Sequence, residues 1–212
     1  MTLEEAIAKI RPLDHNAMEI AQKRWDGIAK PLHSLGKLET LLIQIAGITG
    51  NAEVDLSRRG LIAMCADNGV VEEGVTQTGQ EVTAIVAENF LKYDTSVGVM
   101  CKQNHAEIFP VDMGMVTDTK VRTDHKIAYG TQNMTKGPAM TREQAVKGLE
   151  AGIDMVRELN DKGYRILATG EMGIGNTTTS SAVASVLLKQ PVEEMTCLLY
   201  TSPSPRDSTS SR

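Results

Sequence analysis

The sequence is poor in aromatic residues and cysteine, and it contains no long apolar run. Its 212 residues include one Trp, four Tyr and two Phe, so a surface that stacks nucleic-acid bases is not expected. Three widely spaced cysteines, Cys65, Cys101 and Cys197, fit neither a disulfide framework nor a zinc site, and we interpret them as buried thiols. No window reaches the roughly 18 apolar residues that a membrane-spanning helix needs.

Clustered charge of one sign is also missing. The 22 Lys and Arg residues are dispersed among 27 Asp and Glu residues, for a net charge of −5, which argues against nucleic acid as a partner. The first residues, Met1–Glu5, lack the basic-then-apolar layout of a signal peptide. The four histidines are scattered and offer no metal-ligand spacing. These absences predict a cytoplasmic protein with neither a nucleic-acid nor a membrane partner.

Residues 1–50 are predicted to form a small helical unit. Thr2 and Glu5 make a capping box for a short first helix, and Asp14 can cap a second helix. A third helix is expected to close at Gly47 and Gly50. The apolar faces of the second and third helices are Ala17, Ala21, Trp25 and Ile28, and Leu38, Leu41, Leu42 and Ile45.

From residue 51 to residue 196 the pattern changes to strands alternating with helices. Short apolar runs predict buried strands at Leu61–Ala66, Ala106–Val111 and Tyr164–Thr169. A further strand is expected between Asp118 and Gly137. The fold class is therefore α/β: an incomplete, parallel-sheet, three-layer Rossmann-like domain that follows the small N-terminal helical unit.

Three helices are predicted between these strands. Thr78 with Glu81 forms a capping box for the first, a second lies near Thr95–Cys101, and Thr141 with Gln144 opens a long third helix that Gly163 stops. The inward faces are expected to be Val82, Ile85, Val86 and Phe90 in the first helix, and Ala145, Leu149, Gly152, Val156 and Leu159 in the third.

An acidic residue follows each predicted strand and stands two residues before a glycine. The three segments are Asp67–Gly69, Asp112–Gly114 and Glu171–Gly173. Because the carboxyl ends of parallel strands line the ligand crevice, we expect three carboxylates at one edge of the sheet. The alternative is that each acid only caps a turn or the next helix.

A glycine-rich segment, Gly170–Thr179, lies between the third predicted strand and a helix through Ala182, Val183, Val186 and Leu187. Glycines let the backbone approach a ligand closely, and the N–H groups at a helix start attract a phosphate or carboxylate. The segment lacks the lysine of a Walker loop, and its glycine order is not the dinucleotide GxGxxG. We therefore expect an anion site here, with a structural strand-to-helix turn as the alternative.

Four segments carry more specific motifs. They are KPLHSLGKLE at Lys30–Glu39, MCADNGV at Met64–Val70, GPAMTR at Gly137–Arg142 and GEMGIGNTT at Gly170–Thr178. Together, and in this order, they resemble the signature segments of the nicotinate-nucleotide:dimethylbenzimidazole phosphoribosyltransferase family. The resemblance covers residues 14 to about 196. Two positions depart from the family pattern, because His33 stands where the family usually has Gly and Asn68 stands in place of a His.

The resemblance implies an enzyme, a glycosyltransferase of the pentosyl class that uses no cofactor and no metal. The family transfers the phosphoribosyl group of nicotinate mononucleotide to 5,6-dimethylbenzimidazole or a related azole. The products are α-ribazole 5′-phosphate and nicotinate, in cobalamin nucleotide-loop assembly. The full-length form is expected to be a homodimer.

The resemblance also implies roles for residues at matching positions. Glu171 is expected to give electrostatic support beside the reacting ribose, with Asp67 as a weaker candidate catalytic residue. The expected nucleotide contacts are Gly173, Gly175, Asn176 and Thr177, and the expected azole contacts are Thr78 and Val86. A glutamine is common in the family at the position of Val86, so the choice of azole is left open.

Part of the family's machinery has no counterpart in this sequence. The family's principal general base is a Glu in a glycine-rich segment near its C-terminus, and nothing here matches that segment. Residues 197–212 contain seven Ser or Thr and two Pro, which predicts a disordered tail. Leu199–Asp207 resembles translated cloning or adapter DNA, and a natural flexible tail is the alternative.

The expected organisation is therefore a helical unit at 1–50, a partial α/β phosphoribosyltransferase domain at 51–196, and a non-native tail at 197–212. We expect the 212-residue chain to be truncated and inactive, although the full-length protein is an enzyme.

Two other functions remain open from the sequence. Asp67, Asp112 and Glu171 could bind Mg²⁺ through oxygen ligands, as in a magnesium-dependent phosphate enzyme. The protein could also be a nucleotide- or azole-binding module that kept the crevice without the chemistry. A metal-dependent gain in thermal stability would favour the first function, and binding without turnover would favour the second.

Overall fold

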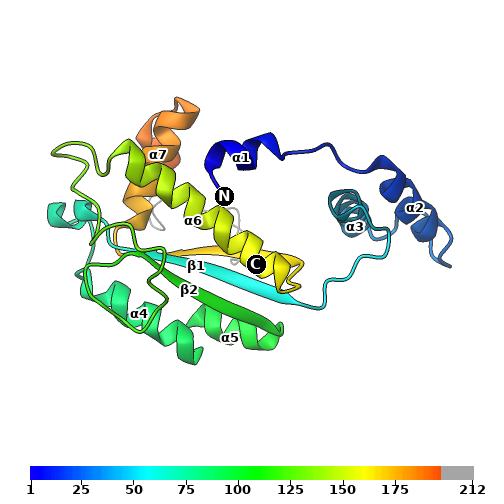
Figure 1. The fold of residues 1–212 in the computed structure, drawn as a ribbon, viewed down its shortest axis with the longest axis horizontal. Helices are drawn as coiled ribbons and strands as arrows, with labels where there is room; N and C mark the ends of the chain where they lie inside the picture. The colour runs from blue at the N-terminus through cyan, green and yellow to red at the C-terminus, as the bar shows by residue number, and fades with distance from the viewer. Residues whose placement is uncertain (197–212) are drawn as a thin grey trace, which may run out of the picture. The chain divides into compact units, whose positions relative to one another are not determined.

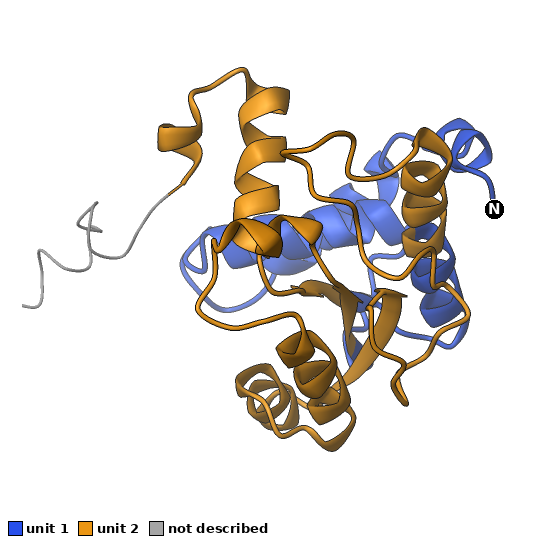
Figure 2. Ribbon diagram, turned by 90° about the vertical axis from the view of Figure 1, so that its left-hand side faces the viewer, with its two compact units in different colours: residues 1–59, 153–166 blue, residues 60–152, 167–212 orange. Residues whose placement is uncertain are grey.

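The computed structural model describes residues 1–196, which form two compact units (Figure 2). The first unit comprises residues 1–59 and 153–166, and the second comprises residues 60–152 and the chain from residue 167 onward. Within the described range, no helix is both long and apolar enough to cross a membrane. The tail predicted at 197–212 lies outside the described residues.

The first unit contains α1 (Leu3–Ala8), α2 (His15–Asp26) and α3 (Lys37–Thr49). Both predicted helix caps are confirmed. The Glu5 N–H donates to Thr2 Oγ1 at 3.2 Å, and the Ala17 N–H donates to Asp14 Oδ1 at 2.9 Å. Each cap satisfies a main-chain N–H group that a helix start otherwise leaves without a partner.

The two glycines predicted to end α3 have different roles. Gly50 has a left-handed φ of 65° and ends the helix as expected. Gly47 instead lies inside α3, where an added Cβ would come within 2.7 Å of the Met18 side chain on α2. A glycine is needed at this point because the two helices pack closely there.

The apolar faces predicted for α2 and α3 are only partly correct. Ala17 and Ala21 are buried. Ile28 lies beyond the end of α2 and is half exposed, as are Leu38 and Leu41 on α3. The helical spacing is therefore right, but much of this apolar surface is not covered within residues 1–196.

The sheet consists of three parallel strands in the order β2-β1-β3: β1 (Arg59–Ala66), β2 (Ala106–Gly114) and β3 (Ile166–Met172). All three strands were predicted. However, β2 and β3 each end three residues later than expected, at Gly114 and Met172, so Asp112 and Glu171 lie within strands rather than after them.

Helices lie on both faces of this sheet. The helices α4 (Glu81–Lys92) and α5 (Ser96–Gln103) cover one face, and the N-terminal part of α6 (Arg142–Asp161) lies over the other (Figure 1). Three shorter or later elements complete the chain: the 3₁₀-helix η1 (Gly69–Glu73), α7 (Asn176–Leu188) and α8 (Val192–Met195). The three-layer α/β arrangement is the one predicted.

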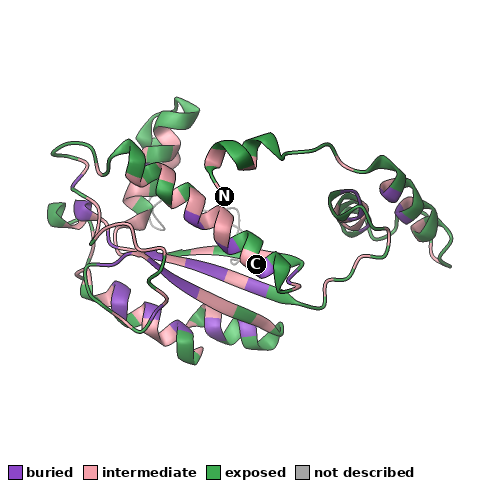
Figure 3. Cartoon of the chain, in the orientation of Figure 1, coloured by how far each residue is buried: buried purple, intermediate pink, exposed green. Residues whose placement is uncertain are grey.

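The main apolar core of the second unit lies between the sheet and α4. It contains Ala63, Cys65, Ala84, Ala87, Phe90, Met115 and Val121 (Figure 3). The predicted capping box of α4 is wrong, because Gln80 rather than Thr78 precedes the helix and no side chain caps it. The inward face is also shifted: Ala84 and Ala87 are buried, whereas Ile85 is exposed. The buried face of α4 therefore runs through Ala84, Ala87 and Phe90.

The face predicted for α6 needs a similar correction. Thr141 and Gln144 form the expected capping box, with N–H to side-chain distances of 2.9 and 3.2 Å. Leu159 is buried as predicted, but Ala145, Leu149 and Val156 are exposed. The buried stripe runs instead through Ala151, Met155 and Leu159.

The strand expected between Asp118 and Gly137 is absent from the described structure. This segment forms a single bridge, between Val111 and Arg122. It is otherwise bonded to the strand ends, because the Gly130 N–H donates to the Gly114 carbonyl and the Thr131 N–H donates to the Asp67 carbonyl, at 2.9 and 3.0 Å.

Candidate active site

The three predicted carboxylates lie near the carboxyl ends of the strands, but they do not form one cluster. Ile108 on β2 and Met172 on β3 both pack against the core below α4. Because side chains alternate along a strand, Asp112 shares the face of Ile108, whereas Glu171 points to the opposite face. Within residues 1–196, no group of three or more His, Cys, Asp or Glu residues could hold a metal ion. The three carboxylates thus lie at one edge of the sheet, as expected, but on different faces, and the described residues offer no ligand set for magnesium.

Asp67 and Asp112 are fully buried and shape the turn that follows β2. Asp112 Oδ1 accepts the N–H groups of Gly114 and Met115 at 3.0 and 2.8 Å. Asp67 Oδ2 accepts the Val116 N–H at 2.8 Å, while its Oδ1 has no hydrogen-bond partner in the described structure. These bonds agree with the alternative in which the acids fix turns. A catalytic role for Asp67 stays a prediction.

Glu171 lies near the end of β3, next to the start of α7. The Asn176 side-chain amide, on the first residue of α7, donates to the Glu171 carboxylate. Although the side chain is exposed on one side, partial burial raises the pKa of Glu171 above its ordinary value of 4.5, and the Asn176 hydrogen bond lowers it. A carboxylate with a raised pKa and a specific donor is typical of a functional site.

Two glycines shape the loop between β3 and α7. Gly175 has a left-handed φ of 86° and directly precedes α7. Because glycine has no side chain, this position does not cap the first N–H groups of the helix. Gly173 is buried against the end of β1, where an added Cβ would overlap the Ala66 carbonyl oxygen and lie 2.9 Å from Asn68 Nδ2. The structure therefore groups these predicted site residues: Glu171, Gly173, Gly175, Asn176 and Thr177.

The two predicted azole contacts lie in different environments. Thr78 is exposed in the turn before α4, whereas Val86 packs against the apolar core. The α4 residue that bonds to the glycine-rich loop is instead Thr83, whose Oγ1 accepts the Ile174 N–H at 3.1 Å. Thr83 could not be identified from the sequence, because a lone polar residue on a helix gives no periodic signal.

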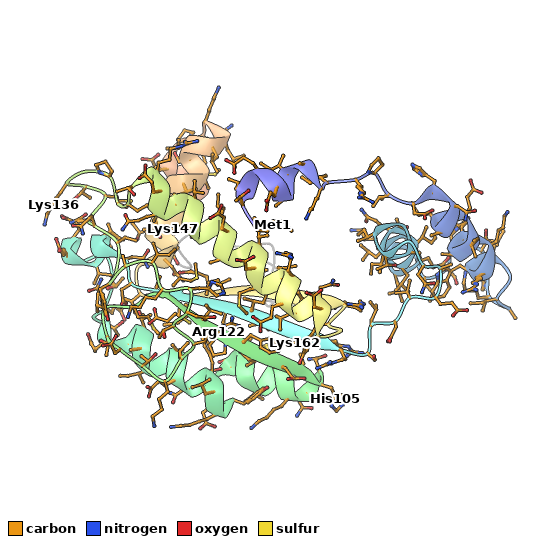
Figure 4. The ribbon with its side chains drawn as sticks, in the orientation of Figure 1. Met1, His105, Arg122, Lys136, Lys147 and Lys162 are labelled. Carbon is orange, nitrogen blue, oxygen red and sulfur yellow. The ribbon has the colours of Figure 1, made fainter. Side chains whose placement is uncertain are left out.

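Three basic side chains in the segment between β2 and α6 are already paired. The pairs are Lys126 with Asp112, Arg122 with Asp124, and Lys136 with Glu72, at 3.1, 2.5 and 2.5 Å. Arg122 and Lys136 are labelled in Figure 4. These cations are therefore engaged by carboxylates. At the start of α7, the N–H groups of Asn176 and Thr178 donate to the Gly173 and Gly175 carbonyls at 3.0 and 3.1 Å, so an anion beside Glu171 would share these donors.

A cavity of about 460 Å³ lies between the sheet and α6 in the second unit. Its lining includes Met64 on β1, Met113 on β2, Met140 and Gly148, together with residues 127–132, and it contains no charged side chain. A phosphate would find no charge partner there, so this cavity is distinct in chemistry from the loop at Glu171.

Comparisons with known proteins agree with this architecture. A family model described as phosphoribosyltransferase matches residues 10–198. The nicotinate-nucleotide–dimethylbenzimidazole phosphoribosyltransferases of Ruminiclostridium cellulolyticum and Clostridium acetobutylicum are 50% and 49% identical to the chain over 197 residues. Each match covers 92% of this chain and 56% of the relative. The chain therefore spans about half the length of the curated relatives it matches.

A solved structure gives the same result for the fold. CobT from Thermus thermophilus is similar to this chain with a TM-score of 0.79 and 33% sequence identity, over 91% of this chain and 58% of that chain. Because the family model covers most of the sequence, and because the glycine-rich loop, its glutamate and the sheet are arranged as described, the chain belongs to this phosphoribosyltransferase family.

Proposed function

We propose that the protein that contains this chain transfers the phosphoribosyl group of nicotinate mononucleotide to 5,6-dimethylbenzimidazole or a related azole. The observation that carries the proposal is the Glu171 carboxylate, which is bonded to Asn176 beside the glycine-rich start of α7. The printed names of the relatives, about half of whose length this chain spans, support the same reaction.

The chemistry of the transfer suits a carboxylate at this position. The nicotinate leaves as a neutral pyridine nitrogen, so no general acid is required, while positive charge develops on the ribose carbon. A fixed carboxylate stabilises that charge, most strongly where water is partly excluded. The Asn176 amide holds the Glu171 side chain in one orientation and favours its ionised form.

The glycine-rich loop is proposed to hold the nucleotide. Gly173 and Gly175 allow the backbone to approach the ligand. The positive end of the α7 dipole and the Thr177 N–H group can attract its phosphate or carboxylate, while the neighbouring N–H groups of Asn176 and Thr178 also donate to the loop. Asn176 and Thr177 add side-chain donors at the same point. The incoming azole must lose a proton, which requires a general base that none of these residues supplies.

We also propose the azole contacts, the oligomeric state and the cellular location of the full-length protein. Thr78 and Val86 are proposed as azole contacts. The full-length protein is proposed to act as a homodimer, and its location is proposed to be cytoplasmic. The dispersed charges and the absence of a membrane-spanning helix within residues 1–196 support the last point.

The reaction can be tested in a chimera that joins residues 1–196 to the unmatched part of the R. cellulolyticum relative. We expect azole-dependent release of nicotinate from nicotinate mononucleotide by the chimera, and none by the 212-residue chain. Loss of a general base alone costs about 10² to 10⁴ in rate, and loss of positioning costs more. In the chimera, Glu171→Gln should lower kcat at least about tenfold, because a neutral amide stabilises positive charge less well.

Glu19→Gln is the matched control, since Glu19 is exposed on α2. The pH profile gives an independent readout. Because the pKa of Glu171 is raised, activity should fall on the acid side at a pH above 4.5, as the carboxylate becomes protonated. Azole binding without any turnover by the chimera would favour a non-catalytic binding module, and full activity of Glu171→Gln would reduce Glu171 to a turn residue.

A further inference from the structure

The glycine-rich loop is bonded to two other elements through both main-chain groups of one residue, Ile174. Asn68, just after β1, donates from its side-chain amide to the Ile174 carbonyl at 3.1 Å. The Ile174 N–H donates to Thr83 Oγ1 on α4, also at 3.1 Å. Asn68 and Thr83 are separated from Ile174 by 106 and 91 residues in the chain. The loop is therefore held by long-range contacts rather than by its own sequence.

Asn68 is itself fixed at two further points. Gln80 Nε2 donates to the Asn68 carbonyl at 3.1 Å, and the Thr179 hydroxyl is shared between Asn68 Oδ1 at 3.2 Å and the Asn176 carbonyl at 3.0 Å. The amide of Asn68 thus donates to the loop before α7 and accepts from the first turn of α7. Asn68 also packs against both loop glycines, because an added Cβ on Gly173 or Gly175 would approach its side chain to 2.9 or 3.6 Å.

Thr83 is a polar residue in an otherwise apolar layer. It is fully buried, as are Ala84 and Ala87 on the same helix. A buried hydroxyl lowers stability unless it is hydrogen-bonded, so its position calls for a partner. The partner is the Ile174 N–H, which would otherwise be an unpaired main-chain group in the loop.

We infer that Asn68 and Thr83 are positioning residues that fix the nucleotide-binding loop by holding both main-chain groups of Ile174. This inference rests on the proposed function, because it assigns the held loop to the nucleotide. Neither side chain needs to touch a reactant. Each acts through Ile174 on Gly173 and Gly175, and so on the direction of the Glu171 and Asn176 side chains. Loss of either bond gives the loop more freedom and moves the nucleotide relative to Glu171.

The test uses variants that each remove one hydrogen bond to Ile174. Asn68→Asp also adds a negative charge, whereas Thr83→Val adds none, so an effect shared by both variants reports the loss of the bond. Asn68→Asp keeps the acceptor for Thr179 but replaces the donor to Ile174 with an oxygen. Thr83→Val keeps the shape and removes the hydroxyl, and Thr83→Ser restores it. Thr131→Val is the matched control, because Thr131 Oγ1 accepts the Gly69 N–H at 3.0 Å and does not bond to the loop.

The first measurement is amide hydrogen exchange of residues 173–176 in the 212-residue chain. Exchange should be at least about tenfold faster in Asn68→Asp and Thr83→Val, as expected from the loss of one buried hydrogen bond. It should remain near the wild-type rate in Thr83→Ser and Thr131→Val. Unchanged exchange in the first two variants, or equal acceleration in Thr131→Val, overturns the inference.

The second measurement is steady-state kinetics in the chimera. Asn68→Asp and Thr83→Val should raise KM for nicotinate mononucleotide at least about fivefold with little change in KM for the azole, since only the nucleotide loop is loosened. Thr83→Ser should recover the wild-type KM. An active chimera with unchanged KM in both variants overturns the inference alone. A wild-type chimera without activity counts against the proposed function, and the exchange rates then decide whether the two side chains hold the loop.

Discussion

Gly173 shows how one position without a side chain lets the site form. The residue lies where β3 turns into the loop, and an added Cβ would overlap the Ala66 carbonyl and lie 3.0 Å from Glu171 Oε1. The obstacle is a main-chain atom of β1, which cannot move without disturbing the strand. A larger residue at position 173 therefore forces the loop away from the end of β1 and shifts Glu171.

Gly173→Ala should lower the free energy of unfolding of the chimera by about 1–3 kcal/mol, as is usual when a methyl group is forced into a packed site. The measurement is urea unfolding followed by circular dichroism. Gly152→Ala is the matched control, since Gly152 lies in α6 with no atom within 4 Å of an added Cβ. That change should raise stability by up to about 1 kcal/mol, because Ala favours a helix over Gly. Equal stabilities for the two variants would contradict the close packing at Gly173.

Individual residues were predicted well where their type alone sets the chemistry. The glycine-rich segment was correctly predicted to lie between a strand and a helix, and the roles of its glycines and of Glu171 stay predictions. Asp67 and Asp112 have the same local pattern, yet they bond to main-chain N–H groups of the turn after β2. The face of the sheet that each carboxylate occupies depends on its position within the strand, and the sequence does not give the strand ends accurately enough to show it.

Among the elements, the segment between α2 and α3 carries an unusual buried ion pair. Lys30 Nζ lies 2.9 Å from Glu39 Oε1, and the Glu39 side chain is only 3% exposed. Glu39 also accepts the Leu35 N–H at 3.0 Å. The hydrogen bond from Lys30, followed by that from Leu35, lowers the pKa of Glu39 below 4.5. The pair therefore fixes residues 31–36, which include His33 with a left-handed φ of 57°.

Lys30→Met should lower the urea midpoint of the first unit, because it leaves a buried carboxylate without a cation. Adding Glu39→Gln should recover part of the loss, since the neutral amide can still accept the Leu35 N–H. Trp25 is the only tryptophan, and its ring centroid is 5.8 Å from Lys30 Nζ, so its fluorescence reports on this unit. Lys23→Met, at an exposed position on α2, is the control.

The sign of the pH effect follows from the lowered pKa of Glu39. A carboxyl group whose folded-state pKa is lowered stabilises the fold above its unfolded pKa, and this contribution is lost as the pH falls through the folded value. Wild-type stability should therefore fall on acidification below about 4.5, the unfolded value. Lys30→Met should flatten this dependence. A double variant less stable than Lys30→Met would argue against the pair.

Helices and strands were predicted better than the faces they bury. Capping residues and glycine stops act locally, so the starts at Thr2, Asp14 and Thr141 agree with the structure. Which side of a helix is buried depends on what lies opposite. On α4 the structure buries Ala84, Ala87 and Phe90 and leaves Ile85 exposed, and the spacing of the large apolar residues does not show which of these positions face the sheet. A strand was wrongly expected within residues 118–137. That segment is held by hydrogen bonds to the strand ends, which its own sequence does not reveal.

At the scale of the whole molecule, residues 1–196 expose a large amount of apolar surface. On α7, Val186 and Leu187 are 77% and 76% exposed, and Val183 and Leu188 are exposed beside them. On α3, Leu38, Leu41 and Ile48 are at least half exposed. Figure 3 shows α7 largely in the colour of exposed residues. Contiguous apolar patches of this kind on a protein surface favour association with another apolar surface.

The 212-residue chain should therefore self-associate at micromolar concentration. The apolar face of α7 is exposed in this chain, and removing its four large side chains from water is worth roughly 1.5–3 kcal/mol each. Sedimentation velocity at several concentrations measures the effect. Val186→Lys with Leu187→Lys should shift the distribution toward monomer, because buried lysines would oppose association. The control carries two substitutions at exposed polar positions, Lys120→Gln and Lys147→Gln, and should not shift the distribution. A chain that sediments as a monomer throughout would show that these faces do not drive association.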